Sequence, residues 1–278
     1  MILLLLVLNF TAFYSLSNCL FKYLKIFLSL LPLRLYTGTF FEKYYAHLIN
    51  HNLNPFRMKK TGLMLLVVGL FFCLTAQTKY STFYYQRTSL FEKLSVNAKD
   101  IIFLGNSITN GAEWAELFQN KRVKNRGISG DICQGVYDRL TPITAGKPSK
   151  IFLMIGINDM ARGTSIDSIA DATLKIIKKI QSESPRTRIY LQSILPVNDS
   201  FGMFQGHMKR KADIKPLNGK LEQLSKTEKI TFIDLYSHFV IPDTEFMNPA
   251  YTNDGLHLTG EGYLKWVEIM KPFLKAKK

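Results

Sequence analysis

Residues 101–111 read IIFLGNSITNG, a short apolar run followed by a glycine, an asparagine and a serine. The run from Ile101 to Leu104 fits a buried strand, because a strand covered on both faces needs no polar alternation. Gly105 and Asn106 then favour a tight turn. Ser107 can begin a helix after that turn. The stretch therefore predicts a strand–turn–helix unit that exposes Ser107 at the turn.

The rest of the chain continues this alternation of short β-branched runs and longer amphipathic stretches. Such alternation is typical of βαβ units and of a mostly parallel sheet. The longest amphipathic stretch begins after Ser165, which can cap a helix, and must end before Pro185. We predict one α/β domain with five strands: 101–104, 123–125, 151–155, 188–194 and 231–234.

The N-terminal part has a different composition, because its apolar residues form long runs. Two lysines after Met58 precede an apolar run at residues 63–74 and the small residue Ala76, which is the layout of a secretory signal peptide. We predict a signal peptide at 58–76 and one folded domain at 77–278. Two explanations for residues 1–57 stay open: an over-extended start, which we favour, or a membrane segment. The expected location is exported, whether periplasmic, extracellular or envelope-associated, and the second explanation adds membrane association through the N-terminal segment.

Charge and cysteine content narrow the function classes. The net charge is +15, and it is +9 without residues 1–76, which hold seven Lys/Arg and one acid. The remaining cations are scattered without an aromatic-interleaved basic stripe, so we expect no nucleic-acid partner and favour anionic glycans or a membrane surface. Cys133 is the one cysteine after residue 76, so no internal disulfide is expected there, and no cysteine pair has zinc-ligand spacing.

Four short segments can bring polar side chains to one place. The carboxyl ends of parallel strands meet at one edge of a sheet, where open α/β folds bind their ligands. Three segments follow predicted strands and one precedes the predicted last helix: Gly105–Ile108, Gly127–Asp131, Gly156–Asp159 and Asp254–His257.

These segments together supply the groups that ester hydrolysis requires. Ser107 is the predicted nucleophile, His257 the base, and Asp254 the group that orients the base. The backbone N–H groups of Ser107 and Gly130 and the side-chain amide of Asn158 are the predicted oxyanion donors. Because the four segments together supply a nucleophile, a base and three oxyanion donors, they predict acyl transfer without a metal or other cofactor.

In these segments the chain resembles the SGNH (GDSL-type) esterases and lipases, over roughly residues 100–273. The run DGLHLTGEGY at 254–263 is most similar to a subgroup with the platelet-activating-factor acetylhydrolase catalytic subunits and bacterial carbohydrate acetylesterases such as sialate O-acetylesterases. The family's usual Gly-Asp-Ser has Asn106 here, and Ile108 replaces the usual Leu. The resemblance implies a flavodoxin-like three-layer α/β/α sandwich and a serine-dependent ester hydrolase.

Alternatives remain for individual residues. His238, four residues after Asp234, is a rival base, although its surroundings do not match the closing segment. The glycines between 105 and 111 are not followed by Gly-Lys-Ser/Thr, so ATP binding is not expected. The aperiodic stretch 196–212 suggests a lip over a binding site. The predicted substrate contacts are Asn106, Asp159, Arg162, Phe201 and Phe204.

The predicted function is removal of acetyl or other short acyl groups from a carbohydrate-type substrate through an acyl-enzyme intermediate. A lysophospholipase or thioesterase acting on lipid acyl groups is the alternative within the same class. A non-catalytic glycan-binding envelope protein is the alternative from another class. The sequence predicts no oligomeric state.

Overall fold

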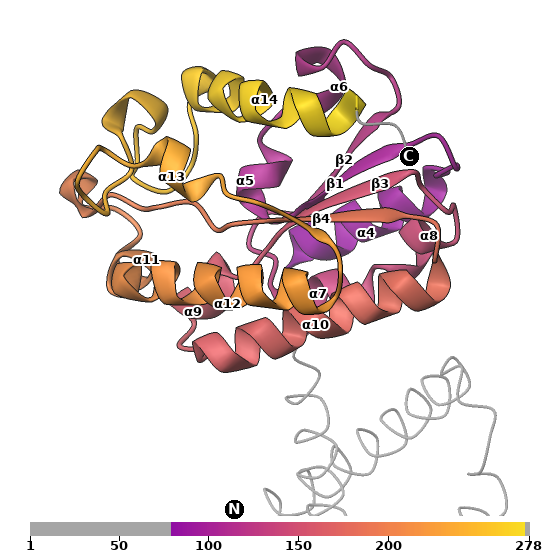
Figure 1. Ribbon diagram of the computed structural model, residues 1–278, viewed down its shortest axis with the longest axis horizontal. Coiled ribbons are helices and arrows are strands. Elements are labelled where there is room, and N and C mark those ends of the chain that lie inside the picture. The colour runs from indigo at the N-terminus through magenta and orange to yellow at the C-terminus, as the bar shows by residue number, and fades with distance from the viewer. Residues whose placement is uncertain (1–78, 276–278) are drawn as a thin grey trace, which may run out of the picture. The chain divides into compact units, whose positions relative to one another are not determined.

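The computed structural model describes residues 79–275, so the predicted signal peptide and the residues before it lie outside the described part. The strands are β1 (Ile101–Gly105), β2 (Val123–Gly127), β3 (Lys150–Met154), β4 (Arg188–Gln192) and β5 (Thr231–Ile233) (Figure 1). The helices are α4 (Thr82–Lys93), α5 (Ser107–Asn110), α6 (Trp114–Leu117), α7 (Cys133–Asp138), α8 (Thr141–Thr144), α9 (Ile157–Ala161), α10 (Ile166–Glu183), α11 (Gln205–Met208), α12 (Ile214–Thr227), α13 (Tyr236–Phe239) and α14 (Gly260–Lys275). Short 3-10 turns are η1 (Asp199–Phe201), η2 (Lys211–Asp213) and η3 (Pro249–Tyr251).

The five strands form one parallel sheet in the order β2-β1-β3-β4-β5, which confirms the predicted fold class. The strand ends differ from the prediction by one or two residues. β1 extends to Gly105, which pairs with Gly127 of β2. β4 ends at Gln192 and not at Ile194, because the backbone N–H of Ile194 donates to the Asn218 side chain at 2.8 Å.

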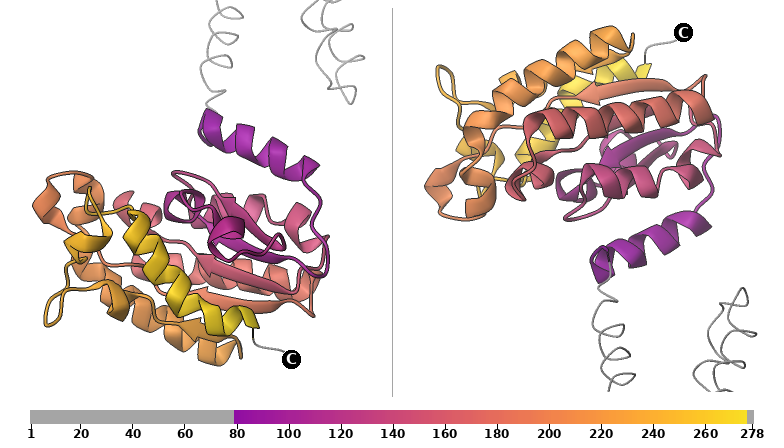
Figure 2. Two further views of the ribbon diagram at one scale, coloured as in Figure 1. Left: turned by 90° about the horizontal axis from the view of Figure 1, so that it is seen from above. Right: turned by 90° about the horizontal axis from the view of Figure 1, so that it is seen from below.

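Helices cover both faces of the sheet, giving three layers (Figures 1 and 2). α5, α6 and α14 lie on one face, and α7, α10 and α12 lie on the other. α10 begins after Ser165, whose hydroxyl accepts a hydrogen bond from the N–H of Ser168, and it ends at Glu183 before the predicted proline stop. Within residues 79–275, no helix combines the length and the apolar content that crossing a membrane requires.

An aromatic layer anchors β1 against the rest of the sheet. Phe103, Phe152 and Tyr190 occupy paired positions on neighbouring strands, with ring centroids 5.0 and 4.5 Å apart. Trp114 stacks on Phe103 at 4.1 Å, and Trp266 of α14 meets Trp114 edge-on at 4.9 Å. Each such ring buries on the order of 200 Å². This packing fixes the end of β1, where Ser107 follows.

Helix α4 was not predicted from the sequence. Its apolar residues do not form one stripe: Tyr84 and Phe91 are buried, whereas Phe83 and Leu90 are exposed. The Tyr84 hydroxyl donates a hydrogen bond to the Gly135 carbonyl at 2.8 Å, which attaches α4 to α7. Periodicity cannot identify a helix whose apolar residues face several directions.

Candidate active site

The turn after β1 presents Ser107. A Cβ on Gly105 would lie 2.4 Å from the Met154 carbonyl oxygen, so the chain requires a glycine where β1 ends beside β3. Asn106 is buried, and its side-chain oxygen accepts a hydrogen bond from the N–H of Ile108 at 3.0 Å. Asn106 thus caps α5, and Ser107 is the first residue of this helix.

The turn before α14 presents His257. One carboxylate oxygen of Asp254, Oδ1, accepts hydrogen bonds from the backbone N–H groups of Leu256 at 2.8 Å and His257 at 2.7 Å. Gly255 has φ +83°, and a Cβ there would lie 2.0 Å from the Asn198 carbonyl oxygen. The turn therefore needs both the aspartate and the glycine of the Asp254–His257 segment.

The two turns bring the predicted nucleophile and base together across 150 residues of sequence. Ser107 Oγ lies 3.0 Å from His257 Nε2, and His257 Nδ1 lies 2.7 Å from Asp254 Oδ2. Burial opposes ionisation of Asp254, but hydrogen bonds from the backbone of His257 and Leu256 and from the His257 ring outweigh it and lower the Asp254 pKa. An ionised Asp254 accepts a hydrogen bond from Nδ1–H, which keeps the ring proton on Nδ1 and leaves Nε2 free to accept the serine proton.

The predicted oxyanion donors have N–H groups available. Within the described residues, the backbone N–H groups of Ser107 and Gly130 make no hydrogen bond. Gly130 is exposed at the tip of its turn, with φ +78°. Asn158 Nδ2 donates to the Asp131 carbonyl at 2.9 Å, and a side-chain amide carries a second N–H beyond this one. The three donors follow β1, β2 and β3, the neighbouring strands at the centre and one edge of the sheet.

A buried ion pair supports the loop that carries Gly130. Arg139 Nε lies 2.8 Å from Asp131 Oδ2, and both side chains are almost fully buried. Burial raises the pKa of Asp131, and Arg139 opposes this shift. Arg139 also donates to the Gly105 carbonyl at 3.0 Å, which ties the Gly130 loop to the Ser107 turn.

Asp159, a predicted substrate contact, connects two helix starts. Its carboxylate oxygens lie 3.1 and 3.2 Å from the backbone N–H of Cys133, the first residue of α7. Burial raises the pKa of Asp159 to about 6, although the Cys133 N–H favours the charged form. Burial also raises the pKa of the Cys133 thiol, which lies in the hydrophobic core.

Two residues of the predicted lip contact the site. The Phe204 ring meets the His257 ring nearly edge-on, with centroids 5.1 Å apart. His207 Nε2 lies 2.9 Å from Asn158 Oδ1. Sequence reasoning did not select His207, because no motif includes it. Its one signal was its place in the aperiodic stretch 196–212.

The other predicted residues lie in different surroundings. Arg162 Nη2 donates to the Gly130 carbonyl at 3.0 Å, so Arg162 lies beside a predicted oxyanion donor. Phe201 is half-buried in η1, and within residues 79–275 it makes no ring contact with His257. His238, the rival base, is exposed on α13, and in the described part of the chain the Ser107 hydroxyl is hydrogen-bonded to His257 and not to His238. The substrate contacts of Asn106, Asp159, Arg162, Phe201 and Phe204 stay predictions.

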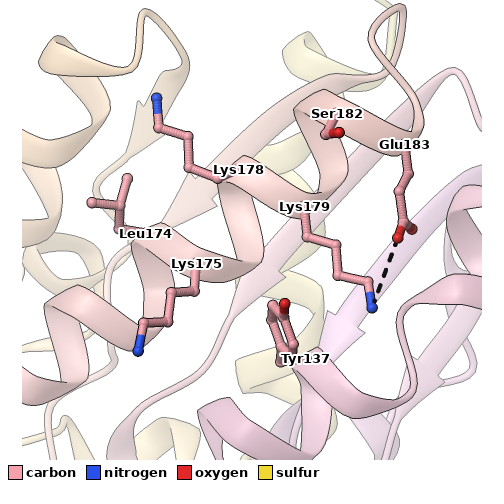
Figure 3. Close-up of a pocket in the computed structure, with 7 residues that line it drawn as sticks. All are labelled: Tyr137, Leu174, Lys175, Lys178, Lys179, Ser182 and Glu183. Carbon is pink, nitrogen blue, oxygen red and sulfur yellow. Dashed lines mark ion pairs between the residues drawn. The ribbon is translucent and has the colours of Figure 1, made fainter.

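A surface hollow of about 490 Å³ lies elsewhere, along α10 and beside Tyr137 of α7 (Figure 3). None of the predicted site residues lines it; the lining residues are Tyr137, Leu174, Lys175, Lys178, Lys179, Ser182 and Glu183. The ion pair Lys179–Glu183 spans one end at 3.8 Å. Across residues 79–275, no three His, Cys, Asp or Glu side chains are grouped so that they could hold a metal ion.

Comparison with protein families gives the class of the molecule. The GDSL-like lipase/acylhydrolase family model matches residues 103–265, more than half of the chain. The chain therefore belongs to the GDSL-like lipase/acylhydrolase family, and it is an ester hydrolase. The matched range includes Ser107 and His257, the residues that the two turns present.

Solved structures agree with this assignment. A Streptococcus pneumoniae protein, provisionally described as a platelet activating factor, is 27% identical over 76% of this chain and 99% of that one, with a TM-score of 0.63. A GDSL-like lipase from Bacteroides thetaiotaomicron is 25% identical over 69% and 97%, with a TM-score of 0.61. A catalytic mutant of an acetylxylan esterase from Geobacillus stearothermophilus shares the fold at 16% identity over 66% and 98%, with a TM-score of 0.53. No curated protein matches the chain.

Proposed function

We propose that Ser107, His257 and Asp254 hydrolyse a carboxylic ester through an acyl-enzyme intermediate. The observation that carries the proposal is the unbroken chain of contacts from Ser107 Oγ to His257 Nε2 at 3.0 Å and from His257 Nδ1 to Asp254 Oδ2 at 2.7 Å. This is the geometry that a serine nucleophile, a general base and an orienting carboxylate require.

The reaction has two halves. In the first, His257 Nε2 takes the Ser107 proton while Oγ attacks the ester carbonyl, and the protonated His257 then gives this proton to the departing alcohol. In the second, a water molecule loses a proton to His257 and attacks the acyl-serine, and Ser107 regains the proton as the acid leaves. In each half the negative oxygen accepts hydrogen bonds from Ser107, Gly130 and Asn158.

The proposed substrate is an acetylated carbohydrate outside the cytoplasm. The acetyl group and the carbohydrate rest on the resemblance of residues 254–263 to carbohydrate acetylesterases, and on a fold shared with an acetylxylan esterase. Export rests on the signal-peptide pattern at 58–76, and membrane association would need residues 1–57 to be retained. Anionic glycans suit the positive charge of the mature chain.

Lipid acyl groups are the second candidate, and a specific observation favours them. Met203 and Phe204 are 49% and 37% exposed on the lip, and Phe204 contacts the His257 ring. Apolar side chains exposed beside a catalytic base offer a surface for an acyl chain. A lysophospholipid or thioester substrate would use this surface.

The test compares the full-length protein with Ser107→Ala and with Ser89→Ala, an exposed serine on α4 that serves as the matched control. Released acid is measured on p-nitrophenyl acetate, acetylated xylan, acetylated sialic acid and a lysophospholipid. The proposal expects rapid release of acetate from at least one glycan, loss of activity in Ser107→Ala at unchanged melting temperature, and full activity in Ser89→Ala.

Each component of the proposal has its own contradicting result. Equal activity in Ser107→Ala and wild type rejects the serine mechanism. Absence of acid release from every substrate in both forms would favour the non-catalytic glycan-binding alternative. Faster hydrolysis of lysophospholipid than of either glycan replaces the carbohydrate substrate with a lipid.

A further inference from the structure

Helix α11 reaches the oxyanion side of the site from the lip. Phe204 precedes α11 in the left-handed conformation, with φ 51° and ψ 46°, which turns the chain sharply into the helix. Gly206 lies beside α9, where an added Cβ would be 3.5 Å from the Ala161 carbonyl oxygen. Met208 is buried. The helix is therefore held at both ends, and His207 lies between them.

The contacts of Asn158 determine which way its amide faces. The Asp131 carbonyl lies 2.9 Å from one end of the amide, and a carbonyl oxygen only accepts hydrogen bonds. That end is therefore the NH₂ group, and the amide oxygen must face His207. Because the amide oxygen also only accepts, His207 Nε2 at 2.9 Å must carry a proton.

We propose that His207 is a positioning residue for ester hydrolysis, whose Nε2–H holds the Asn158 amide so that its second N–H faces the oxyanion. The inference rests on the proposed function, because it takes Asn158 as an oxyanion donor. With Oδ1 bound to His207 and one N–H bound to the Asp131 carbonyl, rotation of the amide breaks two hydrogen bonds. Only the remaining N–H is left for the substrate.

The charge of His207 fits this role. Burial lowers the pKa of His207, and the nearby His257 lowers it further. A neutral imidazole with its proton on Nε2 still donates to Asn158. His257 becomes positively charged during the reaction, and a neutral His207 does not oppose that charge.

The test uses two substitutions that separate shape from hydrogen bonding. His207→Phe keeps a planar ring but removes the donor, and His207→Gln offers an amide N–H near the position of Nε2. Removal of an oxyanion donor costs about 10²- to 10³-fold in turnover. In His207→Phe the Asn158 amide should be misoriented but still present, so kcat should fall by about 10- to 100-fold with little change in KM. His207→Gln should restore most of the lost kcat.

A double-mutant cycle with Asn158→Ala shows whether His207 acts through Asn158. We expect His207→Phe to lower kcat by less than about twofold when Asn158 is already alanine, since coupled residues are not additive. Equal losses in His207→Phe and His207→Gln, or the same loss with and without Asn158, would overturn the proposal. So would wild-type kcat in His207→Phe. These outcomes differ from failure of the proposed function, in which Ser107→Ala stays active.

Discussion

The two turns at 105–108 and 254–257 and the lip at 196–212 build the site in different ways. Each turn fixes its own side chains through hydrogen bonds between residues two or three positions apart, such as Asn106 with Ile108 and Asp254 with His257. The lip acts at long range: His207 contacts Asn158 across 49 positions. Local sequence thus places the reacting groups, whereas tertiary packing orients one of their partners.

The largest expected effect comes from breaking the contact between the two turns. Ser107→Ala or His257→Ala should lower kcat by about 10⁴-fold or more, because a nucleophile and its base act as one unit. The matched control for the histidine is His238→Ala, since His238 is exposed on α13. Steady-state kinetics on p-nitrophenyl acetate measures all three, and a comparable loss in His238→Ala would make the rival base correct.

Removing Asn158, the oxyanion donor that the lip contacts through His207, should have the next largest effect. Asn158→Ala deletes one oxyanion donor and should lower kcat by about 10²- to 10³-fold, with KM changed far less. Stopped-flow or steady-state assays under saturating substrate measure the loss. A rise in KM at constant kcat would show that Asn158 binds the ground state instead of the oxyanion.

This difference also explains how much the sequence could predict. The alternation of short strands and amphipathic helices predicts the fold class, and the parallel sheet brings its polar segments to one edge. The segments at 105–108 and 254–257 carry short-range turn chemistry, so Ser107 and His257 could be identified from local residues. His207 and Phe204 lie in a stretch without periodicity, and their positions depend on how α11 packs against α9. No pattern of local residues encodes that packing. Helix α4 was missed because its apolar residues do not share one face.

A buried carboxylate beside the site gives a stability prediction with a definite sign. The pKa of Asp159 is about 6 in the folded protein, against an ordinary value of 3.8. The folded state therefore binds more protons between these values, and the free energy of unfolding falls as pH rises from about 4 to about 6. The unfolding free energy of Asp159→Asn should not fall in this way, because an amide does not titrate. Its side-chain oxygen can still accept a hydrogen bond from the Cys133 N–H.

We compare the unfolding free energy of Asp159→Asn with that of wild type at pH 4 and at pH 8. The difference, variant minus wild type, should rise by at most about 3 kcal/mol between the two pH values. Urea unfolding at the two pH values measures it. Asp171→Asn is the control, because Asp171 is exposed on α10. A difference that does not change with pH would show that the Asp159 pKa is not raised.

The smallest expected effects concern the lip residue Phe204. Phe204→Ala and Phe204→Gly both remove the ring that contacts His257, and each should lower kcat/KM by about threefold to tenfold, which corresponds to the ~1 kcal/mol of an aromatic pair. Glycine also relieves the left-handed backbone, so Phe204→Gly should be about 1 kcal/mol more stable than Phe204→Ala. Thermal unfolding and kinetics of the pair separate the two contributions. Equal melting temperatures would contradict the predicted backbone strain.

The most direct measurement of the serine mechanism is covalent labelling with an alkyl fluorophosphonate, followed by mass spectrometry of the peptides. A serine activated by its histidine reacts with such reagents, because they mimic the acylation step. We expect one label on Ser107, activity lost in proportion to labelling, and almost no label in His257→Ala. A fully labelled protein that keeps its esterase activity, or a label on another serine that abolishes it, would contradict the proposed mechanism.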